Sequence, residues 1–523
     1  MRKNRGMWGI LTLASLSWMI ACSNSTPHLD LLAADEAASD VAEVAAAELL
    51  ESDFSEPTDA HTPPDILELD GLDDYAATAD ALADMQPDVP WQPPFEPTVC
   101  GSAPHQWLPP QGMGTVVLSQ EELFTNVSPE TIDGILAEVG QDNFGKAKYG
   151  ARNYKIRYVT QDRGVLKEAT AVLGIPTGED VPWPAPMLLW LHGTSGFMDD
   201  CAPSRDMFMG AGSTSLWAGQ GYVTVAPDYM GMLGFGEKSP PGTIHSYLVG
   251  EATAISCLDA ARAALDYLAQ HPDLGSADAS RVVMIGGSQG GHAAFFTELY
   301  WPYYAPELNF LGVAAAVPLV NLLGQASFAM TELANGSGNL MTAMVAMKNW
   351  YGVPADLFDL LTNQEPYFAA QNMEGWLSGS CHPDVDPTDV DELSDVFLEP
   401  IIAAAASGQW DDIPPWGCFL RENSIPGSSV VRKSHIPFLT SYSGEDDLLV
   451  TSIEQEVWPQ LCAMGYTLEY VECAGLGHSQ GALAILPYAR GWLEDRIAGI
   501  PVDAGSTCVM EEPVDCATLV PDN

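Results

Sequence analysis

The sequence predicts an α/β protein whose mostly parallel, eight-stranded sheet has helices on both faces and carries an inserted helical cap. Two observations support this fold class. From about residue 153, short apolar runs typical of strands alternate with segments whose apolar residues recur at helical spacing. Residues 319–433 then interrupt this alternation with stretches rich in Ala, Met and Leu. More than a hundred residues between two strands are too many for a loop, so a separate helical layer is expected there.

Eight segments are predicted to form the sheet. Residues 153–161 and 165–176 are expected to open it as a pair of strands, and residues 186–192 form an apolar run typical of a strand buried on both faces. The other five predicted strands are residues 221–227, 281–286, 310–318, 436–442 and 467–473. A helix is predicted over residues 251–270, and crossovers of this kind imply parallel strands.

The amino-terminal part of the chain is predicted to direct export. Residues 1–22 have a basic start, an apolar run of about 15 residues and a small residue before Cys22, which resembles a bacterial lipoprotein signal. A lipid on Cys22 would anchor the chain to the outer membrane or the cell surface. The alternative is a plain secretory signal and a secreted protein.

Four further parts are predicted along the chain. Residues 23–100 are rich in Asp, Glu, Ala and Pro and contain no Lys or Arg, which predicts an acidic, disordered tether. The domain that follows is expected to consist of two core segments, residues 101–318 and 434–498, on either side of the cap at residues 319–433. Residues 499–523 form a tail that contains cysteines.

The charge of the chain excludes one class of partner. The 20 Lys and Arg residues face 70 Asp and Glu residues, a formal net charge of −50. Nucleic acid would be repelled by such a surface, so no nucleic-acid partner is expected.

Ten cysteines are present, and export would allow them to form disulfides. Close spacing makes Cys462 with Cys473 and Cys508 with Cys516 candidate pairs, and Cys381 with Cys418 is a third. Lipidation of Cys22 would leave nine cysteines, so one is expected to be unpaired or to pair outside the chain. No cysteine or histidine cluster has the spacing of a zinc site, and no metal site is predicted.

The strongest chemical signal is the G-x-S-x-G pattern at residues 286–290. It follows an apolar strand and precedes a helix-compatible stretch, which is the setting of a nucleophile elbow. Gly286 and Gly290 would let neighbouring backbone segments pass closely around a strained turn. Ser288 is therefore the candidate nucleophile, and the pattern is that of the α/β-hydrolase fold.

A serine nucleophile needs a base and an orienting carboxylate, which this fold places in the chain order Ser, acid, His. His478 follows the last predicted strand and is the candidate base. The acid is expected after the preceding strand, where three carboxylates occur within residues 443–450. A Gly-x-x-Asp spacing favours Asp447 as the acid, with Asp446 as its main competitor.

Two backbone N–H groups should stabilise the oxyanion. One is expected from Gln289, directly after the nucleophile. Thr194, in the loop after the third predicted strand, is the expected second donor, with Gly193 or Ser195 as alternatives. This chemistry requires neither a metal nor an organic cofactor.

Several motifs occur in a fixed order along the chain. They span residues 192–196, 200–204, 221–231, 245–248, 258–263 and 286–291. Together they resemble the secretory lipase family related to fungal lipase A, and the resemblance covers residues 150 to 498. It implies a Ser-Asp-His triad that hydrolyses carboxylic esters of lipids beneath a helical lid. The His192-Gly193 opening of the predicted oxyanion loop departs from the fungal lipases.

The resulting hypothesis is a serine carboxylic-ester hydrolase that acts on apolar acyl esters, with Ser288, Asp447 and His478 as its triad. A small-molecule or lipid ester would be the substrate, and an acyl-enzyme the intermediate. A peptidase or amidase of the same fold is the first alternative. A binding module without turnover is the second.

Overall fold

The computed structural model describes residues 100–332, 336–362, 381 and 392–519. The predicted export signal, Cys22 and all but the last residue of the predicted tether lie outside the described residues. Among the residues described, no helix is long and apolar enough to cross a membrane.

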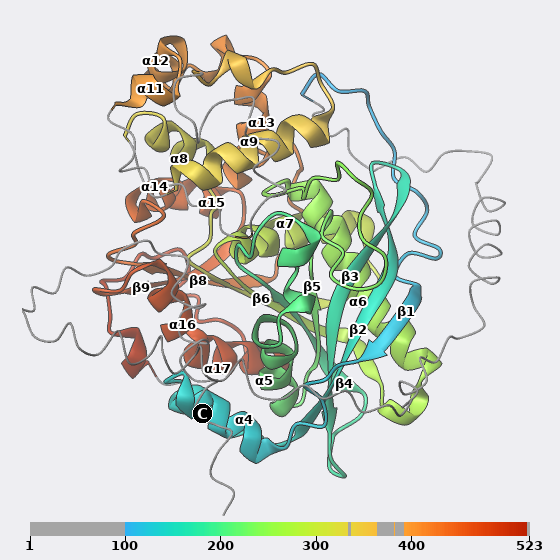
Figure 1. The fold of residues 1–523 in the computed structure, drawn as a ribbon. Helices are drawn as coiled ribbons and strands as arrows, with labels where there is room; N and C mark the ends of the chain where they lie inside the picture. The colour runs from blue at the N-terminus through green and yellow to red at the C-terminus, as the bar shows by residue number, and fades with distance from the viewer. Residues whose placement is uncertain (1–99, 333–335, 363–380, 382–391, 520–523) are drawn as a thin grey trace, which may run out of the picture. The chain divides into compact units, whose positions relative to one another are not determined.

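A nine-stranded sheet lies at the centre of the described domain (Figure 1), in the order β1-β2-β3-β5-β4-β6-β7-β8-β9. The pairs β1–β2, β2–β3 and β3–β5 are antiparallel, and the remaining pairs, from β5 through β9, are parallel. The strands are β1 (Val116–Glu121), β2 (Gly150–Asp162), β3 (Val165–Thr177), β4 (Ala185–Leu191), β5 (Val223–Pro227), β6 (Ala277–Gly287), β7 (Phe310–Ala316), β8 (Pro437–Ser443) and β9 (Thr467–Cys473). The predicted α/β class with a mostly parallel sheet is confirmed.

The count of eight strands was one too low within the described part of the chain. All eight predicted strands are present, and the additional strand, β1, pairs with β2 at the edge of the sheet. Its residues are half-buried or exposed, because an edge strand packs on only one neighbour. It therefore lacks the continuous apolar run by which the central strands were found.

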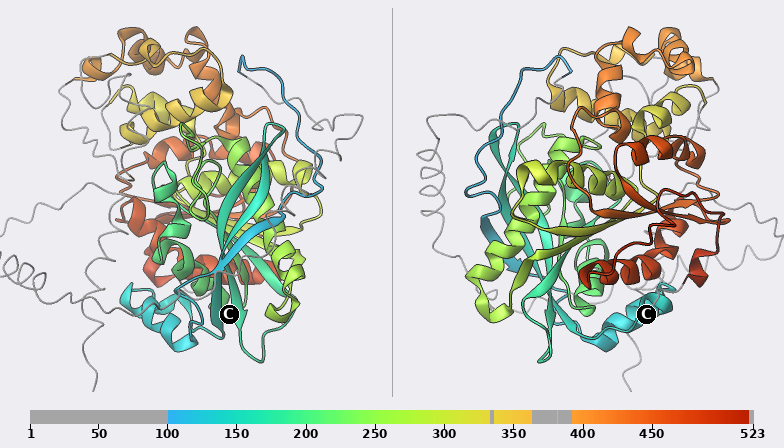
Figure 2. Two further views of the ribbon diagram at one scale, coloured as in Figure 1. Left: turned by 45° about the vertical axis from the view of Figure 1, so that its right-hand side comes forward. Right: turned by 180° about the vertical axis from the view of Figure 1, so that it is seen from behind.

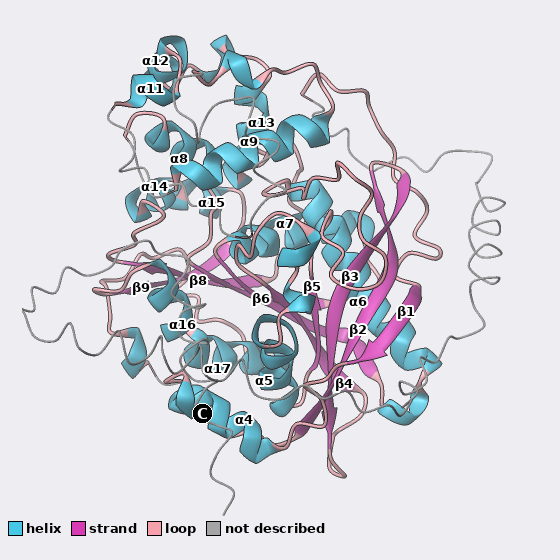
Figure 3. Cartoon of the chain, in the orientation of Figure 1, coloured by secondary structure: helices cyan, strands magenta, loops and turns pink. Residues whose placement is uncertain are grey.

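Helices cover both faces of the sheet (Figures 2 and 3). One apolar layer joins the sheet to α6 (Gly250–Gln270), α7 (Gln289–Tyr304) and α15 (Trp458–Ala463). The layer on the opposite face joins it to α4 (Pro129–Glu138), α5 (Ser213–Gly219) and α17 (Leu486–Ile497). In β4, Leu188 packs in one layer and Leu189 in the other, as the alternation of side chains along a strand requires.

A further group of helices forms between β7 and β8. These helices are α8 (Leu322–Ala329), α9 (Ser337–Tyr351), α11 (Leu393–Val396), α12 (Glu399–Ser407) and α13 (Trp416–Glu422). Their apolar side chains share a buried cluster with Phe197, Met230 and Tyr247, which lie in segments that follow β4 and β5. The helical group therefore packs on the carboxyl-end loops of the sheet, where ligands bind in α/β proteins.

Four disulfides are present among the described residues, and none of the three candidate pairs is among them. The bonds join Cys100 to Cys418, Cys201 to Cys381, Cys462 to Cys508 and Cys473 to Cys516. The expected Cys462–Cys473 pair was wrong because β9 lies between these residues and carries them roughly 20 Å apart. The structure gives Cys257, buried in α6, as a free thiol.

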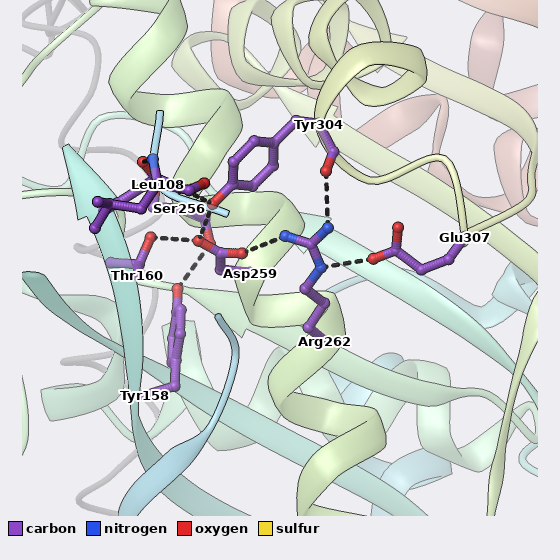
Figure 4. A network of polar contacts seen from close by, with 9 residues as sticks. Leu108, Tyr158, Thr160, Ser256, Asp259, Arg262, Tyr304 and Glu307 are labelled. Atoms are coloured by element: carbon purple, nitrogen blue, oxygen red, sulfur yellow. Dashed lines mark hydrogen bonds and ion pairs between the residues drawn. The ribbon is translucent and has the colours of Figure 1, made fainter. Parts of the chain in front are cut away.

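A buried polar network joins β2, α6 and α7 (Figure 4). The carboxylate of Asp259 accepts hydrogen bonds from the Thr160 hydroxyl at 2.7 Å and the Tyr304 hydroxyl at 2.9 Å, and pairs with Arg262 at 2.8 Å. Arg262 also donates to Glu307 at 2.6 Å. Burial raises the pKa of Asp259 to about 6, against the opposing effect of Arg262 and the hydroxyl donors. The carboxylate of Asp259 therefore holds β2, α6 and α7 together.

Asp259→Ala should lower the free energy of unfolding by about 3–5 kcal/mol, because it leaves Arg262 buried with its main partner removed. Urea unfolding measures this loss. The control is Asp411→Ala, which removes a surface ion pair with Arg421 in which Asp411 is 84% exposed. That loss should not exceed about 1 kcal/mol, and equal losses in the two variants would contradict the role given to the network.

Candidate active site

Ser288 occupies a sharp turn between β6 and α7. Its backbone has φ +56° and ψ −117°, in the left-handed region that a serine rarely adopts. The turn is held by a hydrogen bond from its N–H to the Ala316 carbonyl of β7 at 2.9 Å. Its own carbonyl accepts from the His292 N–H at 3.0 Å. A strained residue that is fixed on both sides marks a candidate functional position.

The glycines around Ser288 are required by close backbone contacts. A Cβ atom on Gly290 would lie 2.0 Å from the Leu191 carbonyl oxygen at the end of β4. One on Gly286 would lie 2.1 Å from the Gly290 carbonyl oxygen. By contrast, a Cβ atom on Gly287 would meet its nearest neighbours, including Ala482, at 3.8 Å. The pattern glycines therefore allow the turn to press against β4.

His478 is the first residue of α16 (His478–Ala484), which packs on β8 and, through Ala482, reaches the Ser288 turn. The side chain of His478 is buried, and its Nδ1 lies 2.8 Å from Oδ2 of Asp446. Its Nε2 is also buried and has no hydrogen-bond partner among the described residues. The ring is thus oriented from one side and has its second nitrogen available.

The expectation that Asp447 orients His478 was wrong, because Asp446 occupies this position. Oδ1 of Asp446 accepts from the backbone N–H groups of Leu448 and Leu449, so the turn points its carboxylate toward the imidazole. Asp447 instead accepts the backbone N–H of His478 at 2.9 Å. It satisfies an unpaired donor at the start of α16. Adjacent residues of a turn point in different directions, and counting from Gly444 could not choose between them.

The loop after β4 lies against the nucleophile turn. A Cβ atom on Gly193 would lie 3.7 Å from the Ser288 Cβ and 3.3 Å from the Gly287 carbonyl oxygen. Gln289 is buried and is the first residue of α7, so no carbonyl of its own helix can accept its N–H. The structure thus brings together the loop of Thr194 and the amide of Gln289, the two positions expected to bind an oxyanion. Their role as donors stays a prediction.

Glu454 of α14 (Thr451–Glu456) is a further buried residue of the site that the sequence did not reveal. Its Oε2 accepts the backbone N–H groups of Val320 and Asn321, at 2.9 and 3.0 Å. Its Oε1 accepts from the Gln325 amide at 2.9 Å, and this amide also holds the backbone of Val450. These bonds attach the loop that carries Asp446 to the beginning of the segment after β7. In the sequence, Glu454 resembles any acidic residue of a solvated helix.

Three buried histidines around the site are held neutral. Burial lowers the pKa of His192 to about 3 and those of His245 and His292 to about 4. Within residues 100–519, as far as they are described, no three His, Cys, Asp or Glu side chains are placed to hold a metal ion.

Comparison with known proteins shows a family resemblance and a fold. Residues 213–375 match the family model described as secretory lipase. The crystal structure of a rice cell wall degrading esterase, LipA from Xanthomonas oryzae, superimposes with a TM-score of 0.57 at 22% identity, covering 74% of this chain and 96% of that one. Candida antarctica lipase A in its closed state gives a TM-score of 0.54 at 15% identity, covering 82% and 87%. The chain has the α/β-hydrolase fold.

Curated relatives of this chain carry the same family resemblance. Lipase 5 of Candida albicans is 26% identical over 326 residues, which is 57% of this chain and 62% of that protein. Lipase A of Arthroderma benhamiae is 25% identical over 295 residues, or 54% and 55%. The matches thus span about three fifths of the relatives' length. The resemblance to secretory lipases predicted from the sequence is confirmed.

Gly290→Ala should destabilise the folded domain by at least about 3 kcal/mol, or prevent folding, because the added methyl group overlaps backbone of β4 that cannot move aside. Gly287→Ala is the matched control at the same turn, and it should cost less than about 1 kcal/mol. Thermal unfolding of the two purified variants measures the difference. Equal stability of both variants would show that β4 yields at this contact.

Stability should fall as the pH rises through the ionisation of Glu454. Burial raises its pKa from 4.5 to about 7, so the folded state binds this proton more tightly than the unfolded state. The stabilisation is complete below the unfolded pKa and is lost as the pH rises through about 7, by about 3 kcal/mol in all. Glu454→Gln should flatten this part of the stability-against-pH curve. Glu456→Gln, at an exposed position of the same helix, should leave the curve unchanged.

Proposed function

We propose that this protein is a serine carboxylic-ester hydrolase that acts on apolar acyl esters, with Ser288 as nucleophile, His478 as base and Asp446 as orienting acid. The observation that carries the proposal is the buried imidazole of His478. Its Nδ1 faces Asp446, its Nε2 has no protein partner, and its helix touches the turn that exposes Ser288. The fold and the secretory lipase resemblance support this assignment.

The proposed reaction uses one nitrogen, Nε2 of His478, for all of its proton transfers. With Nδ1–H donating to Asp446, Nε2 carries a lone pair and accepts the Ser288 proton as the serine oxygen attacks the ester carbonyl. The tetrahedral intermediate collapses as the C–O bond to the alcohol breaks and His478 protonates the departing oxygen. Water then attacks the acyl-enzyme as Nε2 accepts its proton. Nε2 returns this proton to the Ser288 oxygen as the acyl C–O bond breaks, which releases the acid and restores the free enzyme.

The negative oxygen of each intermediate would be bound by the N–H groups of Gln289 and Thr194. Both belong to elements in contact with Ser288, the start of α7 and the loop after β4. Removing one such donor typically costs about 10²–10³ in kcat. The two donors are therefore expected to supply much of the rate enhancement.

An apolar acyl group is proposed because of what covers the site. The helices between β7 and β8 share their apolar cluster with Phe197, Met230 and Tyr247, at the carboxyl ends of the strands. Opening of this layer would present apolar side chains to a substrate near Ser288. The relatives are named lipases, which agrees with this substrate class.

Export is part of the same proposal. Disulfides persist in oxidising compartments, and four are formed by cysteines far apart in the chain. A secreted or surface-bound enzyme fits this observation and the secretory family resemblance. A lipid anchor on Cys22, and the absence of a nucleic-acid partner, stay predictions from the sequence.

The triad is tested by a fluorophosphonate probe and by kinetics. The probe should label the purified protein and fail to label Ser288→Ala. His478→Ala should lower kcat by roughly 10⁴–10⁶, and Asp446→Asn by about 10⁴, because the imidazole loses its orientation. Asp447→Asn is the matched control and should lower kcat less than tenfold. A larger loss at Asp447 than at Asp446 would reverse their roles.

The substrate class is tested by p-nitrophenyl esters of graded acyl length beside a panel of peptide amides. Hydrolysis of the esters, with kcat/KM rising with the apolar surface of the acyl chain, is expected. Preference for the amides would replace the esterase by the peptidase alternative. If the protein is not labelled and turns over neither panel, the binding module is the remaining hypothesis.

A further inference from the structure

A short turn between β5 and α6 contacts both expected oxyanion positions. It contains His245 and Tyr247, each almost completely buried. Residues 245–248 are one of the motifs that carry the family resemblance. The proposed triad and the reaction described above do not use them.

His245 holds the side chain of Gln289. Its Nδ1 lies 2.8 Å from the Met230 carbonyl oxygen, which can only accept, so Nδ1 carries the proton. Nε2 is then an acceptor for the Gln289 amide nitrogen at 3.1 Å. Burial lowers the pKa of His245 to about 4, so the ring stays in this acceptor form at neutral pH. The Gln289 Oε1 has no partner in the described part of the protein, which makes His245 the principal polar anchor of this side chain.

Tyr247 holds the side chain of Thr194 from the same turn. Its hydroxyl lies 2.9 Å from Thr194 Oγ1, and the Tyr247 ring packs edge-on against Phe197 of the same loop. The loop after β4 is therefore attached to the turn by a hydrogen bond and by an aromatic contact three residues further on.

Stacked rings fill the space between the turn and the loop. Tyr229 lies nearly parallel to His192, with centroids 4.1 Å apart, and to His245, with centroids 6.3 Å apart. The Tyr229 hydroxyl donates to the His192 carbonyl at 2.9 Å. Movement of His245 would therefore be transmitted to the loop as well as to Gln289.

We propose that His245 and Tyr247 are positioning residues that fix the distance between the two oxyanion donors, His245 through Gln289 and Tyr247 through Thr194. The inference rests on the proposed function. Oxyanion binding requires both N–H groups within about 2.7–3.1 Å of one oxygen. The two groups lie almost a hundred residues apart on separate elements, so a third element that holds both can set their spacing.

Isosteric variants test the Tyr247 contact. Tyr247→Phe and Thr194→Val each remove one hydroxyl partner, and each should lower kcat about tenfold with KM unchanged. The double variant should lose no more than either single variant, because both remove the same hydrogen bond. The rate of fluorophosphonate labelling should fall by the same factor, since phosphonylation also develops charge on that oxygen.

His245 is tested by rescue. His245→Leu removes the acceptor and should lower kcat about tenfold or more. His245→Gln places an amide oxygen near the position of Nε2 and should restore at least a third of the wild-type kcat. Lack of rescue in a variant that melts at the wild-type temperature would overturn the role given to His245.

Matched variants elsewhere in the chain control for packing. His271 also has its Nδ1 beside a carbonyl oxygen and stacks on a tyrosine, but at the far end of α6. Tyr158 has a buried hydroxyl that donates to the Ser256 carbonyl at 2.9 Å. His271→Leu and Tyr158→Phe should leave kcat unchanged even if they lower the melting temperature.

Failure of the inference can be told apart from failure of the proposed function. A wild-type protein that neither reacts with the probe nor turns over esters would remove the function itself. Two results in an active, labelled wild type would overturn the positioning role alone. One is full kcat in both the Tyr247→Phe and the Thr194→Val variant. The other is a loss of kcat in the double variant that equals the product of the two single losses.

Discussion

The close contact between the Ser288 turn and the end of β4 is the constraint on which the site depends. Because Gly290 passes against the Leu191 carbonyl oxygen, the nucleophile, the start of α7 and the loop after β4 are held at van der Waals distance. No side chain could be added there without moving a central strand of the sheet. The left-handed conformation of Ser288 is held by backbone hydrogen bonds on both sides, from its N–H to Ala316 and from His292 to its carbonyl.

Buried carboxylates join the elements around the Ser288 turn. Apolar packing alone would not fix how these elements are oriented relative to one another. Asp259 joins β2, α6 and α7, and Glu454 joins the Asp446 loop to the segment after β7. A third, Asp228, accepts from the backbone N–H and the hydroxyl of Ser204, and burial raises its pKa to about 6. A buried carboxylate is costly unless its partners are well placed, so each one requires its neighbours to keep a defined position.

Much of the fold could be predicted because it follows from local pattern. The central strands are apolar along their whole length, and the G-x-S-x-G pattern describes a turn whose steric demands the structure shows directly. Details that depend on contacts between distant residues could not be predicted. The choice between Asp446 and Asp447 is decided by the direction of a turn, and the disulfide partners by the course of the chain around β9. Glu454 had no sequence signal, since its burial comes from residues more than a hundred positions away.

The carboxyl-terminal disulfides have a consequence for the candidate base. The Cys462–Cys508 and Cys473–Cys516 bonds close overlapping loops, with sequence separations of 46 and 43, and His478 lies inside both. A single backbone cleavage anywhere between Cys473 and Cys508 would leave the two fragments joined by both bonds. The two disulfides therefore hold this part of the molecule together independently of the backbone, so a protease that cuts the backbone there would release neither fragment.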